Sequence, residues 1–279
     1  MDLQIETFWT SSSHSPIHER CWANVGNFFA QQGMVVVVAN HQLVYYDPKA
    51  NDADGVGENV SAKYPDGADD IQLTREWIYE NISKREYGQG SPENVVLMGH
   101  SSGGAHIAMN LYAEVAGVIY LSVPFWYDRE KPLRQKIIRR YYGSDAEDVW
   151  GMIRLYCNST LASENSMELT FLLSDSSKIP IYIGTVKWEV KESCDATIDF
   201  FNAYRAKSIP AGTLPNFHVL DKHNHVTYDL WDNIDGICKQ LMISSSNVLS
   251  IGTEDSVQAE KLLEFIRSCI PSLSSGSKL

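Results

Sequence analysis

The chain has 279 residues, 44% of them hydrophobic and 21% charged, proportions that are typical of globular proteins and exclude wholesale disorder. Its 23 Lys and Arg against 35 Asp and Glu give a net charge of -12, which opposes binding to nucleic-acid phosphates. No run approaches the roughly 20 apolar residues that cross a bilayer, and no secretion signal begins the chain. We therefore expect a cytoplasmic protein without nucleic-acid or membrane partners.

The first half of the chain contains one strongly apolar strand and two helical patterns. Residues 34–39 form a continuous apolar, mostly β-branched run, which predicts a strand that is covered on both faces. Apolar residues at helical spacing predict a helix over 22–30. The segment 47–67 is rich in Asp, Gly, Asn and Pro and predicts a loop, followed by a helix over 69–83.

The rest of the chain continues the alternation of strands and helices. The predicted elements are a strand over 95–98, a helix over 102–115, a strand over 117–123, a helical cap over about 124–170 with helices near 133–142 and 147–156, a strand over 179–183, a helix over 192–207, a strand over 217–220 and a helix over 256–270. This order predicts an α/β fold with a mostly parallel sheet and helices on both faces. Without repeats or a linker, we expect one domain over 1–279.

The most informative segment is Gly99-His100-Ser101-Ser102-Gly103, which matches the pattern Gly-x-Ser-x-Gly between a buried strand and a helix. The two glycines permit a sharp strand-to-helix turn that raises the Ser101 hydroxyl above the carboxyl edge of the sheet. The turn also places the Ser102 N–H at a helix N-terminus, where the helix dipole favours a developing oxyanion. The pattern predicts Ser101 as a nucleophile and Ser102 as an oxyanion-hole donor.

A serine hydroxyl requires a neighbouring base, and the loop after the strand 217–220 offers His223 and His225. We favour His225, because its farther position gives the chain room to turn towards Ser101. The remaining histidines have other predicted places: His14, His18 and His41 flank the pocket entrance, His100 packs beneath the turn, and His106 lies in the helix that follows.

The third member of the set is a carboxylate that orients the imidazole. The first acidic residue after the strand beginning at 179 is Glu189, which we favour as the acid. Glu192 and Asp195 fall in the next predicted helix, where acidic residues are common near the N-terminus, and Asp221 is a further alternative. The order Ser–Glu–His agrees with the order of these residues in α/β-hydrolases.

Two groups of side chains have less specific implications. Five scattered cysteines show no Cys-x-x-Cys spacing, so we predict neither a zinc site nor a disulfide framework. We also expect no metal and no cofactor. Several aromatic residues of the cap either wall an aromatic pocket or pack the cap on the core. They are Phe125, Trp126, Tyr127, Tyr141, Tyr142 and Trp150.

Over about 8–270 the chain resembles α/β-hydrolases, most of all the esterase and kynurenine-formamidase-like (arylformamidase) branch, which includes hydrolases of fungal biosynthetic clusters. The resemblance rests on Gly99-His100-Ser101-Ser102-Gly103-Gly104, on Lys187-Trp188-Glu189-Val190-Lys191-Glu192 and on His223-Asn224-His225. It implies Ser101 as the nucleophile, Glu189 as the acid and His225 as the base. It also implies esters, thioesters, lactones or N-formyl aryl amides of small metabolites as substrates, without a cofactor.

One segment departs from this family. Its members usually carry His-Gly-Gly before Phe-Trp, and backbone N–H groups of that segment complete the oxyanion hole. Here Glu6-Thr7 precedes Phe8-Trp9, and because this strand stands at the start of the sequence, we expect the usual leading strands of the fold to be missing. We expect a serine hydrolase that acts on a small apolar or aromatic acyl substrate. A homodimer is compatible with the sequence. The alternative is a non-hydrolytic enzyme or binding protein of the same fold, which catalyses lactonisation, acyl transfer or cyclisation.

Overall fold

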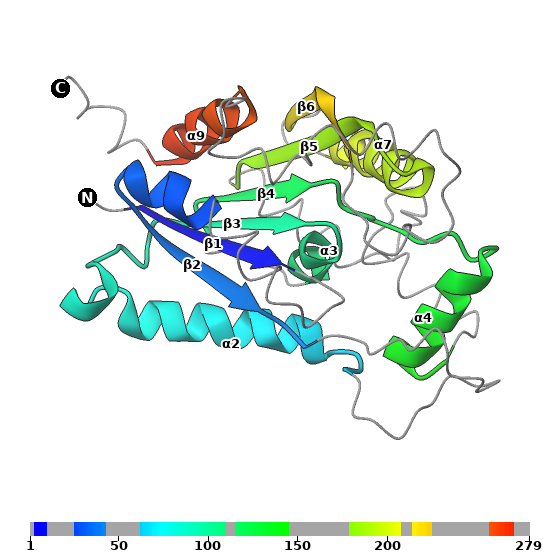
Figure 1. Cartoon of the computed structure of the whole chain (residues 1–279), viewed down its shortest axis with the longest axis horizontal. Coiled ribbons are helices and arrows are strands. Elements are labelled where there is room, and N and C mark those ends of the chain that lie inside the picture. The colour runs from blue at the N-terminus through cyan, green and yellow to red at the C-terminus, as the bar shows by residue number, and fades with distance from the viewer. Residues whose placement is uncertain are drawn as a thin grey trace.

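The computed structural model describes residues 3–9, 25–42, 62–109, 115–144, 179–207, 214–224 and 257–270. Their centre is a six-stranded sheet with the strand order β2-β1-β3-β4-β5-β6, in which every neighbouring pair is parallel (Figure 1). The strands are β1 (Leu3–Trp9), β2 (Met34–Asn40), β3 (Val95–His100), β4 (Gly117–Leu121), β5 (Ile181–Trp188) and β6 (Asn216–Asn224). The prediction of an α/β fold with a parallel sheet is confirmed.

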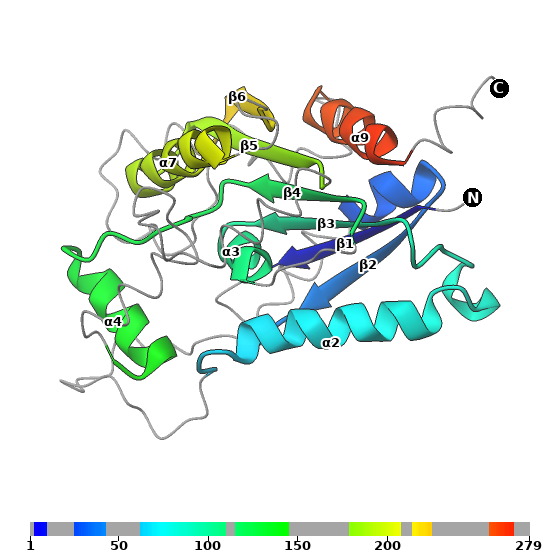
Figure 2. The same ribbon diagram turned by 180° about the vertical axis from the view of Figure 1, so that it is seen from behind.

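Helices cover both faces of this sheet (Figure 2). The helices are α2 (Asp66–Asn81), the short 3-10 helix η1 (Arg85–Tyr87), α3 (Ser102–Met109), α4 (Pro132–Tyr142), α7 (Lys191–Lys207) and α9 (Val257–Cys269). Helices α2, α3 and α7 pack in one apolar cluster with the sheet, whereas α9 and the helical residues 25–31 pack in a second cluster on the opposite face. In the described part of the chain, no helix is long and apolar enough to cross a membrane.

The alternation of side chains along β3 divides the core between these two layers. Val95 and Leu97 pack with α2, α3 and α7, whereas Val96 and Met98 pack with α9. Because successive side chains of a strand point to opposite faces, a strand covered on both faces must be apolar throughout. This explains why 95–98 was recognisable as a buried strand.

The predicted boundaries of several elements differ from the observed ones. Helix α2 begins at Asp66, directly after Pro65, so the end of the predicted loop belongs to the helix. Strand β6 extends to Asn224 and therefore includes His223, which the sequence placed in a loop. The second predicted cap helix, over 147–156, lies outside the described residues.

The contact between β3 and α3 depends on two glycines. A Cβ atom added to Gly99 would lie 2.5 Å from the Cα atom of Gly104 and 2.6 Å from its nitrogen. Both obstacles are backbone atoms, which cannot move aside without shifting the helix against the strand. Gly99 therefore allows α3 to pack directly beside β3, the strand that immediately precedes Ser101.

The buried imidazole of His106 on α3 contacts residues of other elements near the start of α2. The ring of His106 on α3 lies 4.6 Å from the ring of His41 and 5.8 Å from that of Tyr141, measured between centroids. Gly67 at the start of α2 also approaches His106 so closely that an added Cβ would lie 2.6 Å from the ring. Burial, together with a smaller effect of the neighbouring His41, lowers the pKa of His106 to about 3.

We predict that Gly99→Ala lowers the free energy of unfolding by about 1–3 kcal/mol, since the methyl group overfills the contact between β3 and α3. Urea denaturation followed by circular dichroism measures the change. Gly26→Ala is the control, because its added Cβ makes only ordinary contact at 3.7 Å from Val38. Equal effects of the two substitutions would contradict the proposed packing constraint.

We predict that His106 makes the folded state less stable in acid. The folded protein keeps this imidazole neutral down to about pH 3, whereas the unfolded chain protonates it near its ordinary value of 6.5, so stability falls as pH decreases through 6.5. Between pH 8 and pH 5 the contribution is about 2 kcal/mol. Denaturation at pH 8 and at pH 5 measures the loss of stability in the original protein and in His106→Phe. The loss should be smaller in His106→Phe by about 2 kcal/mol.

Candidate active site

Ser101 occupies the sharp turn between β3 and α3. Its φ angle is +52°, in the left-handed region that residues with side chains rarely adopt and that costs of order 1 kcal/mol. Its N–H donates to the Leu121 carbonyl of β4 at 2.9 Å, and its carbonyl accepts from the Ala105 N–H at 3.3 Å. The neighbouring strand and the first helical turn together hold this conformation. Ser101 thus stands at the strand-to-helix turn that the sequence predicted.

Ser102 is the first residue of α3. The N–H groups of a first helical turn have no partner within their own helix and carry the positive end of its dipole. The Ser101 N–H donates to the Leu121 carbonyl of β4. The position of Ser102 at the helix start suits the oxyanion-hole donor that the sequence predicts, although that role stays a prediction.

The neighbouring strand β4 ends with a similar turn, which sequence reasoning missed. Ser122 has a φ angle of +50°, is fully buried and donates its N–H to the Gly184 carbonyl of β5 at 2.8 Å. Two adjacent strands therefore leave the sheet through left-handed serines at the same edge. Carboxyl edges of parallel sheets are where ligands of α/β proteins bind.

Glu189 follows the last residue of β5, so it lies at the same edge of the sheet as Ser101. The side chain is partly buried, and its Oε1 accepts the Val190 N–H at 2.9 Å. This location, just after the strand end, is the one for which Glu189 was preferred as the acid.

Two of the alternative acids are engaged in other contacts. The Glu192 carboxylate is 1% exposed and accepts from the Asp128 N–H at 2.6 Å and the Arg134 Nε at 2.9 Å. Asp195 pairs with Lys191 one turn earlier on the surface of α7. The Glu192 carboxylate therefore binds the start of α4, and the Asp195 carboxylate lies at the solvent-exposed surface of α7. The third alternative, Asp221, lies within β6, where only the backbone is described.

The strand pairing brings the acid and base segments together. Trp188 of β5 pairs with Asn224 of β6, after a register shift that begins at Val186. Glu189 follows the first member of this pair in the sequence, and His223 precedes the second. His225 follows Asn224 but lies outside the described residues, so the preference for His225 over His223 stays a prediction.

The other histidines lie elsewhere. His100 is buried at the end of β3, as predicted, and His106 lies in α3. His218 on β6 has its Nδ1 3.0 Å from the Lys261 Nζ of α9 and stacks on Tyr182, so it belongs to the opposite layer. His14 and His18 fall outside the described residues. None of the described histidines other than His223 adjoins the end of β6.

The register of β1 bears on the second oxyanion donor. Phe8 pairs with Gly99, and Glu6 pairs with Leu97, which is four residues before Ser101. At about 3.3 Å per residue, Glu6 therefore lies about 13 Å back along the sheet from the level of Ser101. Residues 10–24, which continue beyond the end of β1, lie outside the described residues. The register therefore puts the carboxylate-bearing residue of this segment away from the level of Ser101.

Two cap aromatics that were candidates for pocket walls serve packing instead. Phe125 is fully buried and stacks on Phe200 of α7 with a centroid distance of 3.9 Å. Tyr141 is also buried, and its hydroxyl oxygen accepts the Gly67 N–H at 3.3 Å. Trp126 is partly buried and donates from Nε1 to Asp199 at 3.0 Å. Trp150 lies outside the described residues.

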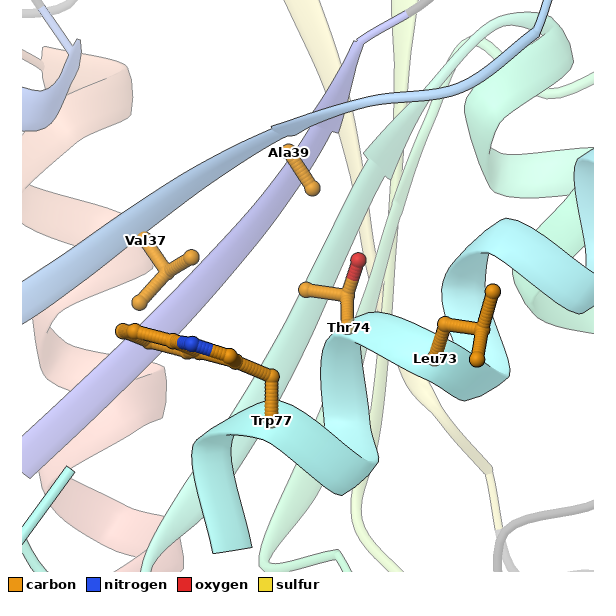
Figure 3. Close-up of a pocket in the computed structure, with 5 residues that line it drawn as sticks. All are labelled: Val37, Ala39, Leu73, Thr74 and Trp77. Atoms are coloured by element: carbon orange, nitrogen blue, oxygen red, sulfur yellow. The ribbon is translucent and has the colours of Figure 1, made fainter. Parts of the chain in front are cut away.

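A groove of about 410 Å³ lies at another edge of the molecule, between β2 and α2 (Figure 3). It is lined by Val37, Ala39, Leu73, Thr74 and Trp77. Strand β2 is the outermost strand, separated from β3 by β1, so this groove is not the site of Ser101. Among the residues that the structure describes, no three His, Cys, Asp or Glu side chains are grouped as metal ligands would be.

Comparisons with known proteins give matches to solved structures alone. No family model matches the chain, and no curated protein matches it.

The solved structures include esterases from three organisms. A fungal esterase of Rhizomucor miehei has a TM-score of 0.59 at 13% identity, over 97% of this chain and 76% of its own. An esterase from the Planctomycetes species Thermogutta terrifontis has a TM-score of 0.53 at 13% identity, over 99% and 85% of the two chains. The esterase of Pyrobaculum calidifontis has a TM-score of 0.53 at 14% identity, over 90% and 76%. Together with the parallel sheet and the turn at Ser101, these similarities show that the chain has the α/β-hydrolase fold.

Proposed function

We propose that this protein is a serine hydrolase that cleaves carboxylic esters of small apolar or aromatic metabolites. The observation that carries the proposal is the strained Ser101 at the turn between β3 and α3. Proteins retain an unfavourable backbone conformation mainly where the surrounding structure enforces it, and such residues cluster at active sites. The similarity to esterase structures supports the same reaction class. Thioesters and N-formyl amides are included because an acyl-serine route serves them equally.

In the proposed mechanism, the Ser101 Oγ attacks the carbonyl carbon while His225 accepts its proton. The Ser102 N–H stabilises the tetrahedral oxyanion, and His225 then returns the proton to the leaving group. Water, deprotonated by the same imidazole, attacks the acyl-serine and releases the acid. Glu189 orients the imidazole and stabilises its charged form. The pairing of Trp188 with Asn224 supports this assignment, since these residues adjoin Glu189 and His225 in the sequence.

A second candidate function is acyl transfer or lactonisation, in which a substrate hydroxyl replaces water in the last step. The departure of Glu6-Thr7 from the family's His-Gly-Gly bears on both functions alike, because each passes through an oxyanion at the same serine. Removal of one oxyanion donor typically lowers turnover by about 10²–10³. Both functions require the same acyl-serine, so they differ in product and not in the first step.

We predict that a fluorophosphonate probe labels the folded protein at neutral pH and that Ser101→Ala abolishes labelling. The probe phosphonylates a serine that is activated by a base, with fluoride as the leaving group. Mass spectrometry of the labelled peptide gives the modified residue. Ser102→Ala is the matched control, because it removes the adjacent hydroxyl while it keeps the backbone N–H. Absence of labelling in the original protein would overturn the assignment of Ser101 as a nucleophile.

We predict that Glu189→Gln lowers kcat for p-nitrophenyl esters by about 10²–10⁴, because the imidazole loses the carboxylate that fixes its tautomer. Asp195→Asn removes a carboxylate from the next helix, where it pairs with Lys191, and should change kcat by less than about twofold. Steady-state kinetics of the two variants measure the difference. Comparable losses in both would remove Glu189 from the proposed mechanism.

A further inference from the structure

We propose that Glu192 is a positioning residue that anchors helix α4 at the carboxyl edge of the sheet, and thereby limits the size of substrate that the site admits. The limit on substrate size rests on the proposed function, whereas the anchoring does not. In Figures 1 and 2, α4 lies beyond the arrowheads of the strands, on the side where α3 begins. The helix is joined to the rest of the molecule near both of its ends.

The first anchor is a buried carboxylate with three donors. Glu192 lies in the first turn of α7 and accepts from the Asp128 N–H at 2.6 Å, from the Arg134 Nε at 2.9 Å and from the Lys131 Nζ at 3.4 Å. Asp128 and Lys131 immediately precede α4, and Arg134 lies in its first turn. A carboxylate that is 1% exposed is stable only when charged and polar partners replace its water. The start of α4 is thus held to α7, three residues after Glu189.

The second anchor is a set of aromatic and backbone contacts. The Tyr141 carbonyl accepts the Tyr64 N–H at 2.6 Å, and the Tyr141 hydroxyl oxygen accepts the Gly67 N–H at 3.3 Å. The rings of Tyr64 and Tyr142 stack at 4.9 Å, and the ring of Tyr141 contacts that of His106 on α3. The end of α4 is therefore joined to the start of α2 and to the helix that follows Ser101.

These anchors give α4 a defined place between the two segments that carry the proposed catalytic residues. One anchor adjoins Glu189, and the other contacts α3, which begins one residue after Ser101. The aromatic anchor consists of contacts that persist when a single charge is removed. Loss of the Glu192 charge should therefore free the start of α4 while its end stays attached. We expect such a movement to let larger acyl groups approach Ser101 without altering the residues that perform the chemistry.

The test uses the full chain with Glu192→Gln, Arg134→Gln and the double variant. Glu192→Gln keeps the shape of the side chain but removes the charge that Arg134 and Lys131 neutralise. Glu130→Gln is the matched control, because its carboxylate is 87% exposed and only loosely paired with Arg129 at 3.8 Å. Hydrogen exchange of peptides covering 132–142 and 62–68 measures the two ends of α4. Kinetics with p-nitrophenyl acetate and octanoate measure KM and kcat.

We expect Glu192→Gln to accelerate exchange over 132–142 by about tenfold while exchange over 62–68 stays close to that of the original protein. We also expect KM for the octanoate ester to fall by about threefold or more relative to the acetate ester, with kcat for acetate changed by less than twofold. Arg134→Gln should have the same effects, and the double variant should be no worse than the stronger single variant, since both residues act in one contact.

Three results would overturn the proposal. They are unchanged exchange over 132–142 in both single variants, an equal change in Glu130→Gln, or a large loss of kcat for acetate in Glu192→Gln but not in Arg134→Gln. The last result would make Glu192 the acid of the catalytic set. If the original protein neither reacts with a fluorophosphonate nor cleaves either ester, the proposed function fails. The exchange experiment still decides whether Glu192 anchors α4, and only the limit on substrate size falls with the function.

Discussion

The close approach of helix α3 to the end of strand β3 is the constraint on which the arrangement of the site depends. Gly99 and Gly104 bring two backbones within a distance that no side chain tolerates, and the chain between them turns through a left-handed Ser101. The bond from the Ser101 N–H to Leu121 fixes this turn to the next strand. A serine that is held in this way loses little conformational entropy when it reacts, because the fold has already fixed its position.

The other candidate residues lie at the same edge of the sheet because the six strands in the described part of the chain are all parallel. Parallel strands end at one edge, so segments that are distant in the sequence meet there. Glu189 follows β5 at this edge, and the pair Trp188–Asn224 brings the end of β6 beside it. The buried charge of Glu192 and the aromatic contacts of Tyr141 then attach α4 to the helices on either side. The architecture of the site is therefore a consequence of strand direction and of a few buried polar contacts.

The imidazole of His106 illustrates how burial separates a structural histidine from a catalytic candidate. Enclosed between Gly67 and the rings of His41 and Tyr141, it stays neutral throughout the physiological range because burial disfavours its charged form. A general base near neutral pH must instead gain and lose its proton readily. The acids differ in their contacts: the carboxylate of Glu192 accepts from Arg134, whereas that of Glu189 accepts the Val190 N–H just after the end of β5.

The sequence by itself was sufficient for the fold class, the buried strand 95–98 and the turn at Ser101, because apolar runs and closely spaced glycines are local signals. It also placed Glu189 after a strand, and the ranking of Glu189 first among the acids stays a prediction. Only the tertiary structure distinguished Glu192 and Asp195 by their partners, assigned Phe125 to packing and placed His223 inside β6. Burial and pairing depend on residues more than 50 positions apart in the chain, such as Arg134 and Glu192. No local pattern encodes such contacts, because they form only when the strands and helices have taken their places.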